Sequence, residues 1–318
     1  MRLLPILLLA LATLCGAQDY PQKNVTIIVP YPAGGPTDQL ARQLAQRFGE
    51  QLGHAFIVEN ATGGGTTIGT GRAARAAPDG HTLLLHNLQI SANVALYPKL
   101  PYDTERDLVA VAFVNRNPLV LVGRKDLPPR TLGELITYMK STSATMAHPG
   151  SGSSGHLATA LFAQAAHLTP VQVPYRGGAP MVQDLLGDHV DLLFGTPQQL
   201  APLVAAGRIK AYGVTSKETY GQFPGAASMV AELGPQLEIF YWHALFAPAG
   251  TPPALIEKLN AVVQRLLADA ALMKSWADIG VSAYPPEERT PPGAEALFKR
   301  EIARWSAVVR EHHIQPVD

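Results

Sequence analysis

The chain has 318 residues, of which 47% are apolar, so it can bury a substantial core in one large or two medium-sized domains. Basic and acidic residues balance at 25 each, and no run of Lys or Arg occurs. This composition argues against a nucleic-acid-binding protein, which usually carries a basic excess or stripe, and against a basic membrane-surface helix.

Residues 1–17 have the pattern of an export signal. Arg2 gives a charged start, and the apolar run that follows, up to Leu14, has the length of a signal-peptide core and is short for a bilayer span. Cys15 and Ala17 place small residues before the expected cleavage site, which follows Ala17. Lipidation of Cys15 is the rival interpretation, and the bulky residue before it argues against that. We therefore expect a soluble protein exported to the periplasm.

The chain contains a single cysteine, Cys15, which the expected cleavage removes. The mature protein would then have no thiol for a disulfide, a nucleophile or a zinc site. The histidines show no spacing typical of a metalloenzyme, and His312 and His313 fit a solvated helix end. The sequence therefore predicts neither a metal nor a cofactor.

In the first half of the chain, apolar strand patterns alternate with amphipathic helix patterns. Strands are expected at 25–29, 55–59, 81–86, 107–114 and 119–123, and helices at 39–52, 67–76 and 131–140. Thr131, followed three residues later by Glu134, has the capping-box pattern of a helix start.

The second half continues this alternation. Strands are expected at 144–147, 170–175, 190–194, 209–215 and 239–247, and helices at 157–166, 181–186, 252–268 and 293–311. Alternating strands and helices favour an α/β chain with mostly parallel sheets. The glycine turns that follow strands fall into two groups, residues 30–95 and 148–197, which suggests two sheets facing each other across a cleft.

The stretch from Val29 to Asp38 reads VPYPAGGPTD and joins the first expected strand to the first expected helix. Similar glycine-bearing junctions occur at 60–67, 149–155 and 176–179. The first turn of a helix has N–H groups without internal partners and partial positive charge, and glycine lets a ligand approach them closely. These junctions therefore predict the binding of a small carboxylate or phosphate. The alternative is that glycine and proline only shape the turns.

Enzyme motifs are absent or incomplete. Residues 150–155 match GxGxxG without an acid near position 175 to bind a ribose, and a second match at 69–74 falls inside an expected helix. Residues 64–69 have the glycine spacing of a P-loop without its lysine. The GxSxG elbow is missing around Ser153 and Ser154, which suit helix capping and hydroxyl donation to an anion. We expect no catalytic residue.

Asp38 and two histidines are further polar candidates near these turns. Asp38 can stabilise the first turn of its helix, orient the N–H groups of the loop or accept from a ligand ammonium. It has no neighbouring acid or histidine in the motif, which argues against a role as a base. His86 and His156 lie beside glycine turns, where a histidine either faces a ligand or has a structural role.

Motifs along the whole chain, taken in order, resemble the Bug family, the TctC-like periplasmic solute-binding proteins of tripartite tricarboxylate transporters. The resemblance is carried by VPYPAGGPTDQLAR, VENATGGGTTIGT, PDGHTLL, SSGHLA, VPYRGGAPMVQDLLG and HALFAPAGTPP. It implies the fold of type II periplasmic binding proteins, two α/β domains with a ligand cleft and a two-strand hinge. Residues 18–121 with 240–318 would form domain one and residues 122–239 domain two, with the hinge at 120–123 and 242–247.

The resemblance also implies a binding site for a small mono- or dicarboxylate, an aromatic acid or an amino acid. One carboxylate would be bound by the opening loop, often through water, and Ala33, Gly34, Gly35 and Thr37 would belong to that loop. Tyr31 is expected either as an aromatic wall for the ligand or as part of the scaffold, and Asp38 is a further candidate contact. A supporting turn would contain Gly63, Gly64 and Thr66. Domain two would close on the ligand with Ser151, Ser153, Ser154, Arg176, Gly177 and Gly178.

The stretch from His86 to Ser91 departs from the family, whose members commonly have a Gly/Ser-rich segment there. The bulkier polar side chains of His86, Asn87 and Gln89 are therefore expected to recognise the far end of the solute. Arg176 is the expected cation for a second carboxylate, although a basic residue is usual at that family position and does not by itself identify the ligand.

By the same resemblance the protein is not an enzyme. We expect a monomeric capture protein that delivers its carboxylate to membrane subunits of the TctA and TctB kind. A second hypothesis is a ligand-sensing partner of a two-component kinase, which would use the same closed surface. A third is an exported hydrolase using Ser154, whose turnover the substitution Ser154→Ala would abolish.

Overall fold

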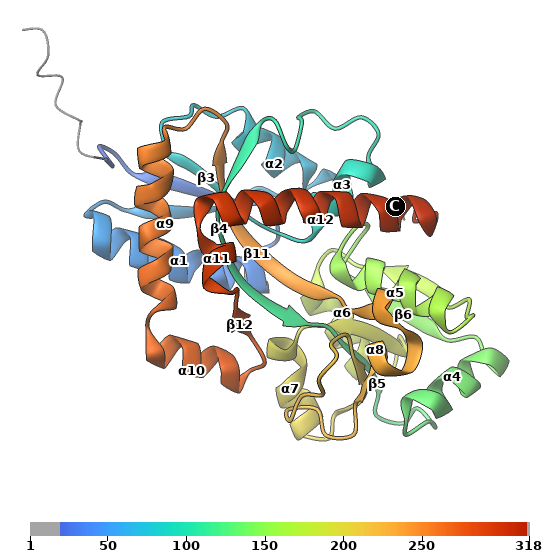
Figure 1. Cartoon of the computed structure of the whole chain (residues 1–318). Coiled ribbons are helices and arrows are strands. Elements are labelled where there is room, and N and C mark those ends of the chain that lie inside the picture. The colour runs from blue at the N-terminus through green and yellow to red at the C-terminus, as the bar shows by residue number, and fades with distance from the viewer. Residues whose placement is uncertain (1–19, 317–318) are drawn as a thin grey trace, which may run out of the picture.

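The chain folds around two sheets. The computed structural model describes residues 20–316, so the expected signal segment and Cys15 lie outside the described residues. Each sheet has six strands, and helices cover the sheets on both faces (Figure 1), which confirms the expected α/β class. Between residues 20 and 316 no helix is both long and apolar enough to cross a bilayer.

The first sheet has the strand order β12-β4-β11-β3-β1-β2. Its strands are β1 (Val25–Val29), β2 (Phe56–Asn60), β3 (Thr82–Asn87), β4 (Leu108–Pro118), β11 (Phe240–Pro248) and β12 (Ser282–Ala283). Strand β1 pairs in parallel with β2 and β3, whereas β11 runs antiparallel to both β3 and β4. The expected parallel arrangement therefore holds only on the β1 side of this sheet.

Helices bury both faces of the first sheet, because successive side chains of a strand point to opposite faces. Ile27 belongs to a core formed with α1 (Pro36–Leu52) and α9 (Pro253–Leu267), next to α10 (Ala270–Asp278). Its neighbour Ile28 belongs to a core formed with α2 (Thr67–Ala74), α3 (Gln89–Leu96) and α12 (Pro291–Glu311), which the short α11 (Pro286–Arg289) precedes. This second core continues into the other half of the molecule.

The second sheet has the order β10-β9-β5-β8-β6-β7. Its strands are β5 (Val120–Arg124), β6 (Thr145–His148), β7 (Val171–Pro174), β8 (Leu192–Gly195), β9 (Ile209–Val214) and β10 (Ala227–Ser228). Its helices are α4 (Leu132–Ser141), α5 (Ser154–Ala165), α6 (Gly178–Leu186), α7 (Pro197–Ala205) and α8 (Met229–Leu233). We call each sheet with its helices a unit. The first unit holds α1–α3 and α9–α12, and the second holds α4–α8.

Two connections join the units, and Thr215 forms a hydrogen bond with each connection. Its hydroxyl accepts from the Leu119 N–H at 2.8 Å and donates to the Ile239 carbonyl at 2.6 Å. The chain therefore crosses between the sheets at Leu119, between β4 and β5, and at Ile239, just before β11. The segments 120–123 and 242–247, expected as the hinge, instead belong to strands of separate sheets.

Helices α3, α7, α8, α10 and α11 were not among the expected elements. Helix α3 matters most for the site, because it places the His86–Ser91 stretch at a strand-to-helix junction. Its sequence QISANVAL is buried at most positions, so it lacks the polar stripe by which a helix is recognised in sequence. The helix at 131–140 is present as α4, and Thr131 caps it by accepting the Glu134 N–H at 3.2 Å.

Candidate functional site

The opening loop leads from β1 into the N-terminus of α1. Gly35 is the N-cap in an extended conformation, Pro36 occupies the first helical position, and no side chain caps the helix. The backbone N–H groups of Gly35, Thr37 and Asp38 have no hydrogen-bond partner among the described residues. The helix N-terminus therefore offers a set of unused donors with partial positive charge.

Asp38 holds this loop in place rather than facing outward. The residue is 2% exposed, and its carboxylate accepts from the Gly34 N–H at 2.9 Å and the Asn60 amide at 2.9 Å. Arg42 adds two hydrogen bonds of 3.0 Å from the next turn of the helix. Burial opposes ionisation of Asp38, but these bonds from Arg42, Gly34 and Asn60 outweigh it and lower its pKa.

Thr37 is the centre of a buried hydrogen-bond chain. Its Oγ1 lies 3.1 Å from His243 Nε2 and 3.1 Å from Tyr241 Oη. The other ring nitrogen of His243 lies 2.8 Å from the Asn115 amide oxygen, which can only accept, so Nδ1 carries the proton. His243 Nε2 must then accept from Thr37. The single hydroxyl hydrogen of Thr37 is thereby used within the protein and is not available to a ligand.

Tyr31, His86 and Asn87 extend this chain toward the loop. Tyr31 donates its hydroxyl to the Asn87 side-chain oxygen at 2.7 Å and lies 3.1 Å from His86 Nδ1. The Asn87 amide donates to Tyr241 Oη at 3.0 Å and lies 3.3 Å from Thr37 Oγ1. Because these side chains satisfy one another, they act as a rigid support for the loop.

The turn before α2 has an unusual backbone. Gly63, Gly64, Gly65 and Thr66 have φ angles of 118°, 57°, 58° and 79°, so a β-branched residue occupies a left-handed position. Such a conformation costs about 1–3 kcal/mol and persists only where the surroundings hold it. Thr66 Oγ1 accepts from Asn93 at 3.0 Å and lies 3.2 Å from His86 Nε2. These bonds fix the direction of the turn.

Gln89 begins α3 and is 5% exposed. Its side-chain nitrogen donates to the Ser151 carbonyl at 2.8 Å and to the Gly65 carbonyl at 3.3 Å. One turn later, Asn93 donates to the same Gly65 carbonyl at 2.9 Å. Gln89 therefore connects the supporting turn of the first unit to the glycine loop of the second.

That glycine loop ends at the N-terminus of α5. Ser153 caps the helix by accepting the His156 N–H at 3.3 Å and donates its hydroxyl to Gly150. The Gly152 N–H donates to His156 Nδ1 at 3.1 Å. Within residues 20–316, neither Ser154 Oγ nor His156 Nε2 has a hydrogen-bond partner, so both remain able to contact a ligand.

The loop that precedes α6 carries Arg176, whose side chain is exposed and has no hydrogen bond or ion pair within the described part of the chain. Gly177 has a φ of 109° and lies against the opening loop, since a Cβ there would come within 3.6 Å of Pro32 Cγ. The structure therefore brings the Arg176–Gly178 loop next to the loop that contains Ala33, Gly34 and Gly35.

Four buried histidines surround these loops, two in each unit. Burial lowers the pKa of His86 and of His243 to about 3. His148 and His156 stack at 4.6 Å between ring centroids, and burial together with His148 lowers the pKa of His156 to about 4. All four are therefore neutral near pH 7, and the region adds no histidine charge to attract an anion.

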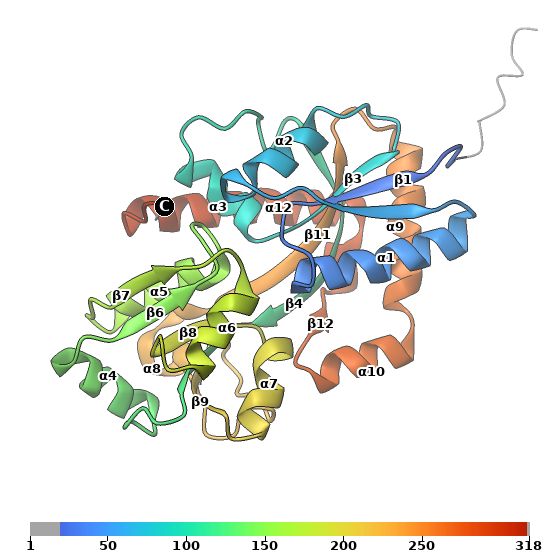
Figure 2. The ribbon, with the colours of Figure 1, turned by 180° about the vertical axis from the view of Figure 1, so that it is seen from behind.

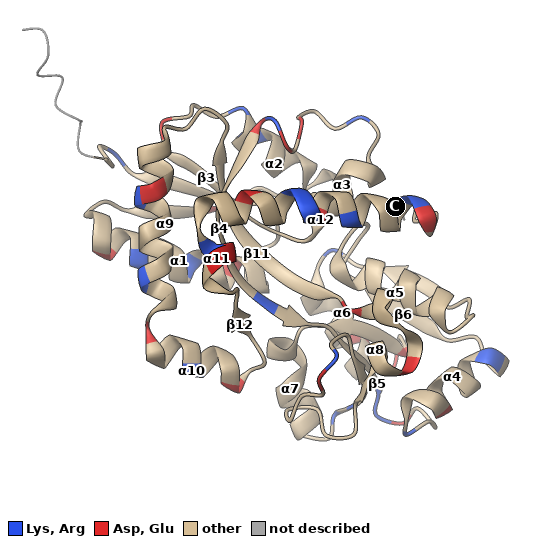
Figure 3. Cartoon of the chain, viewed as in Figure 1, with Lys and Arg blue, Asp and Glu red and all other residues tan. Residues whose placement is uncertain are grey.

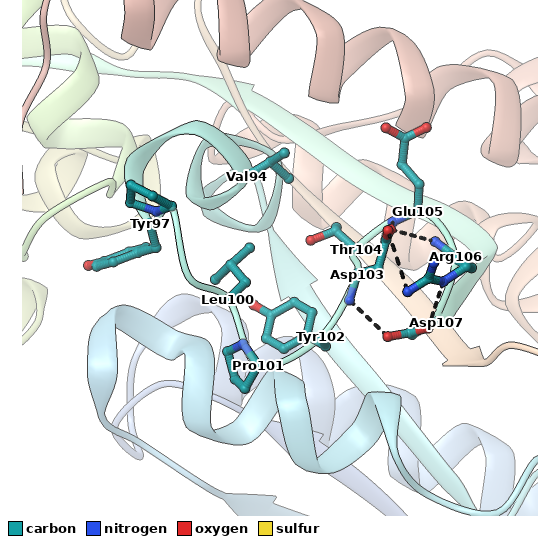
Figure 4. Close-up of a pocket in the computed structure, with 11 residues that line it drawn as sticks. Val94, Tyr97, Leu100, Pro101, Tyr102, Asp103, Thr104, Glu105, Arg106 and Asp107 are labelled. Carbon is teal, nitrogen blue, oxygen red and sulfur yellow. Dashed lines mark hydrogen bonds and ion pairs between the residues drawn. The ribbon is translucent and has the colours of Figure 1, made fainter.

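Charged side chains lie mainly on the outer helices and connections (Figure 3). Within the described residues no group of three His, Cys, Asp or Glu side chains gathers as a metal site would require. An open hollow of about 600 Å³ lies elsewhere, on the loop between α3 and β4 (Figure 4). Its lining includes Tyr97, Thr104 and an Arg106 paired with Asp103 and Asp107, and it contains none of the expected site residues.

Several residues of this arrangement were not identified from the sequence: Asn60, Asn93, Asn115, Tyr241 and His243. Tyr241 and His243 are two residues apart on β11, so both side chains point to the same face of the strand. This spacing of two polar residues is the pattern by which the sequence could have indicated them. Asn93 follows Gln89 by one helical turn, a relation that becomes visible only once α3 is known to be a helix.

The chain matches the family model described as TctC, Tripartite tricarboxylate transporter family receptor, over residues 40–314. Protein BugT of Bordetella pertussis is 35% identical over 300 residues, which cover 93% of this chain and 91% of BugT.

Two solved structures from Rhodopseudomonas palustris are similar over nearly their whole length. MatC, determined with bound malate, has a TM-score of 0.84 and 36% identity, covering 91% of this chain and 100% of MatC. Rpa4515, determined with adipate, has a TM-score of 0.86 and 30% identity, covering 94% of this chain and 100% of that protein.

Proposed function

This chain belongs to the TctC family of tripartite tricarboxylate transporter receptors, also represented by Bug proteins, and we propose that it captures a small organic carboxylate in the periplasm. The family consists of solute-binding receptors and not of enzymes. The observation that carries the proposal is the N-terminus of α1, where the N–H groups of Gly35, Thr37 and Asp38 have no partner within residues 20–316. A carboxylate suits such donors because charge-assisted hydrogen bonds are the strong ones.

The proposed ligand lies between the two glycine loops of the second unit and the opening loop of the first. The first unit supplies backbone donors, supported by Asp38 and the Thr37 chain. The second unit supplies Ser154, His156 and Arg176. The bound malate and adipate of the similar structures support a ligand with two carboxylates, one at α1 and one toward Arg176.

We further propose the expected division into two domains, with its first boundary at Leu119 in place of residue 121, because Val120 and Leu121 pair within the second sheet. The two domains would close about the two connections at Thr215. Closure would exclude water and strengthen the hydrogen bonds to the carboxylate. The closed form would then present its ligand to membrane subunits of the transporter. Export by a cleaved segment at residues 1–17 belongs to the same proposal.

The test uses calorimetry on purified protein stripped of ligand by unfolding and refolding. A short dicarboxylic acid, its monoamide and its diamide form a matched series, with malate and adipate as first probes. We expect saturable binding of the diacid, weaker binding of the monoamide and none of the diamide, since an amide lacks the anion that α1 would bind. Equal binding of all three, or none by any acid of the series, would contradict carboxylate capture.

A further inference from the structure

Among residues 20–316, Gln89 makes a buried amide contact from α3 to the other unit. Its nitrogen has two hydrogens, and each is directed to a backbone carbonyl, Gly65 in its own unit and Ser151 in the second. If the units separated, the Ser151 carbonyl would be hydrated, whereas the bond to Gly65 lies within the first unit and would remain. The bond to Ser151 therefore exists only while the units are together, and the bond to Gly65 aims the amide at it beforehand.

The backbone around this contact is shaped for close approach. Gly152, next to Ser151, has a φ of 72°, and a Cβ there would lie 2.6 Å from Leu96 Cδ1 and 3.6 Å from Gln89 Cγ. Only glycine allows the loop to lie this close to α3 in that conformation. Figure 2 shows the loop before α5 reaching toward α3, in agreement with these contacts.

The side chain of Gln89 is also held at its base. Asn87 accepts the Gln89 backbone N–H at 3.0 Å, and Asn87 itself is fixed by Tyr31 and Tyr241. Gln89 is thus anchored in the same hydrogen-bond chain that supports the opening loop. A carboxylate at α1 and the contact at Ser151 would share one rigid element.

We propose that Gln89 is a latch that holds the two units closed and biases the ligand-free protein toward its closed form. This inference rests on the proposed function, since it presumes that the units open and close around a carboxylate. It assigns to Gln89 a positioning role through the opposite unit, in place of recognition of the far end of the solute.

A second glutamine provides a matched control. Gln222, in the second unit, also donates through its side-chain nitrogen to two carbonyls, those of Ala277 and Asp278 in the first unit, each at 3.2 Å. That contact is exposed, so water replaces it at little cost, whereas the Gln89 contact is buried. The two sites share their chemistry and differ in burial.

The experiment measures spin-label distances by pulsed electron paramagnetic resonance in ligand-free protein. Labels go on Ala77→Cys and Val171→Cys, two exposed positions, one in each unit, in a chain whose described part has no other cysteine. Gln89→Met keeps the length of the side chain and removes its donors, and Gln89→Glu places a carboxylate against two carbonyl oxygens. Urea unfolding of each variant shows that it is folded.

We expect Gln89→Met to raise the ratio of open to closed protein about 2- to 10-fold, the range for one buried hydrogen bond. Gln89→Glu should open the protein further, and Gln222→Met should leave the distances unchanged. Identical distance distributions in all variants, or equal opening in Gln222→Met, would overturn the latch. Because no ligand enters this measurement, the two failures are distinguishable: failure of the latch leaves the spin-label distances unchanged, whereas failure of carboxylate capture abolishes calorimetric binding.

Discussion

The two units present different surfaces to the space that a ligand would occupy. In the first, the polar side chains bond to one another: Tyr31, Thr37, Asp38, Asn87 and His243 all have protein partners. In the second, Arg176, Ser154 Oγ and His156 Nε2 have none within the described residues. From this difference we infer that the first unit would bind the acid group of a ligand with its backbone. The side chains of the second unit would contact the rest of the ligand.

The largest expected effect is on stability in acid, through the buried histidines of both units. His86 and His243 have pKa values of about 3 and His156 of about 4, below the value of about 6.5 in an unfolded chain. Unfolding therefore takes up protons below about pH 6.5, and stability falls as the pH drops further. Each neutral histidine should lower the free energy of unfolding by about 1.4 kcal/mol for every pH unit below about 6.5, until its folded pKa is reached.

Urea unfolding between pH 7 and pH 4 checks this expectation. Replacing His156 with Gln should reduce the slope from about pH 6.5 down to its folded pKa of about 4. Replacing His243 with Gln should reduce the slope over the whole range below about pH 6.5, since the folded pKa of His243 is about 3. The glutamine amide can still accept from Thr37, which limits the accompanying loss of stability. A free energy of unfolding that stays constant from pH 7 to pH 5 would contradict the neutral state of these rings.

Asp38 tests whether the first unit depends on its internal bonds. Replacing it with Ala leaves the Gly34 N–H and one of the two Asn60 amide hydrogens without an acceptor, while the other still donates to the Tyr31 carbonyl. We expect a loss of about 2–4 kcal/mol in the free energy of unfolding. Asp38→Asn keeps one acceptor and should lose less. Because the folded pKa of Asp38 is lowered, its stabilising effect is present above pH 4 and is lost as the pH falls through that lowered value. Equal stability of both variants and wild type would show that the loop does not need this carboxylate.

Thr37 tests the hydrogen-bond chain separately from the loop. Thr37→Val keeps the shape of the side chain but leaves His243 Nε2 and Tyr241 Oη without their shared partner. We expect a loss of about 1–3 kcal/mol in urea unfolding. Thr37→Ser retains the hydroxyl and should recover most of it. If Thr37→Ser loses this stability and Thr37→Val keeps it, the role of Thr37 lies in its methyl group and not in the hydrogen-bond chain.

The α/β class and the glycine junctions could be predicted from the sequence because strand, turn and helix signals are local. The role of Asp38 in holding its loop was one of the alternatives that local reasoning left open. The partners of Thr37 could not be predicted, since Tyr241 and His243 lie about two hundred residues away in sequence. Helix α3 was missed because a helix buried on most sides lacks amphipathic periodicity, and with it the connection from Gln89 to Ser151 was missed.

Substitution of Arg176 tests whether the second unit binds the part of the ligand that lies away from α1. Arg176→Gln removes the exposed cation and should weaken a dicarboxylate about 10-fold in calorimetry, in the range of a charged hydrogen bond. The monoamide of the same acid, which lacks the second charge, should lose less. The free energy of unfolding should not change, because Arg176 has no partner within residues 20–316 to lose. If the acid and the monoamide lose affinity equally, Arg176 attracts anions in general and does not bind the second carboxylate.

The smallest effect separates two adjacent serines of the second unit. Ser153 caps α5 by accepting the His156 N–H, so Ser153→Ala should cost about 1 kcal/mol in the free energy of unfolding. The Ser154 hydroxyl makes no protein hydrogen bond in the described part of the chain, so Ser154→Ala should change stability by less than about 0.5 kcal/mol. If Ser154 donates to the ligand, its variant should bind more weakly at unchanged stability, whereas Ser153→Ala should affect both. If Ser154→Ala loses stability and binds the ligand normally, Ser154 stabilises helix α5 and does not contact the ligand. The second unit would then resemble the first, in which the polar side chains contact the protein itself.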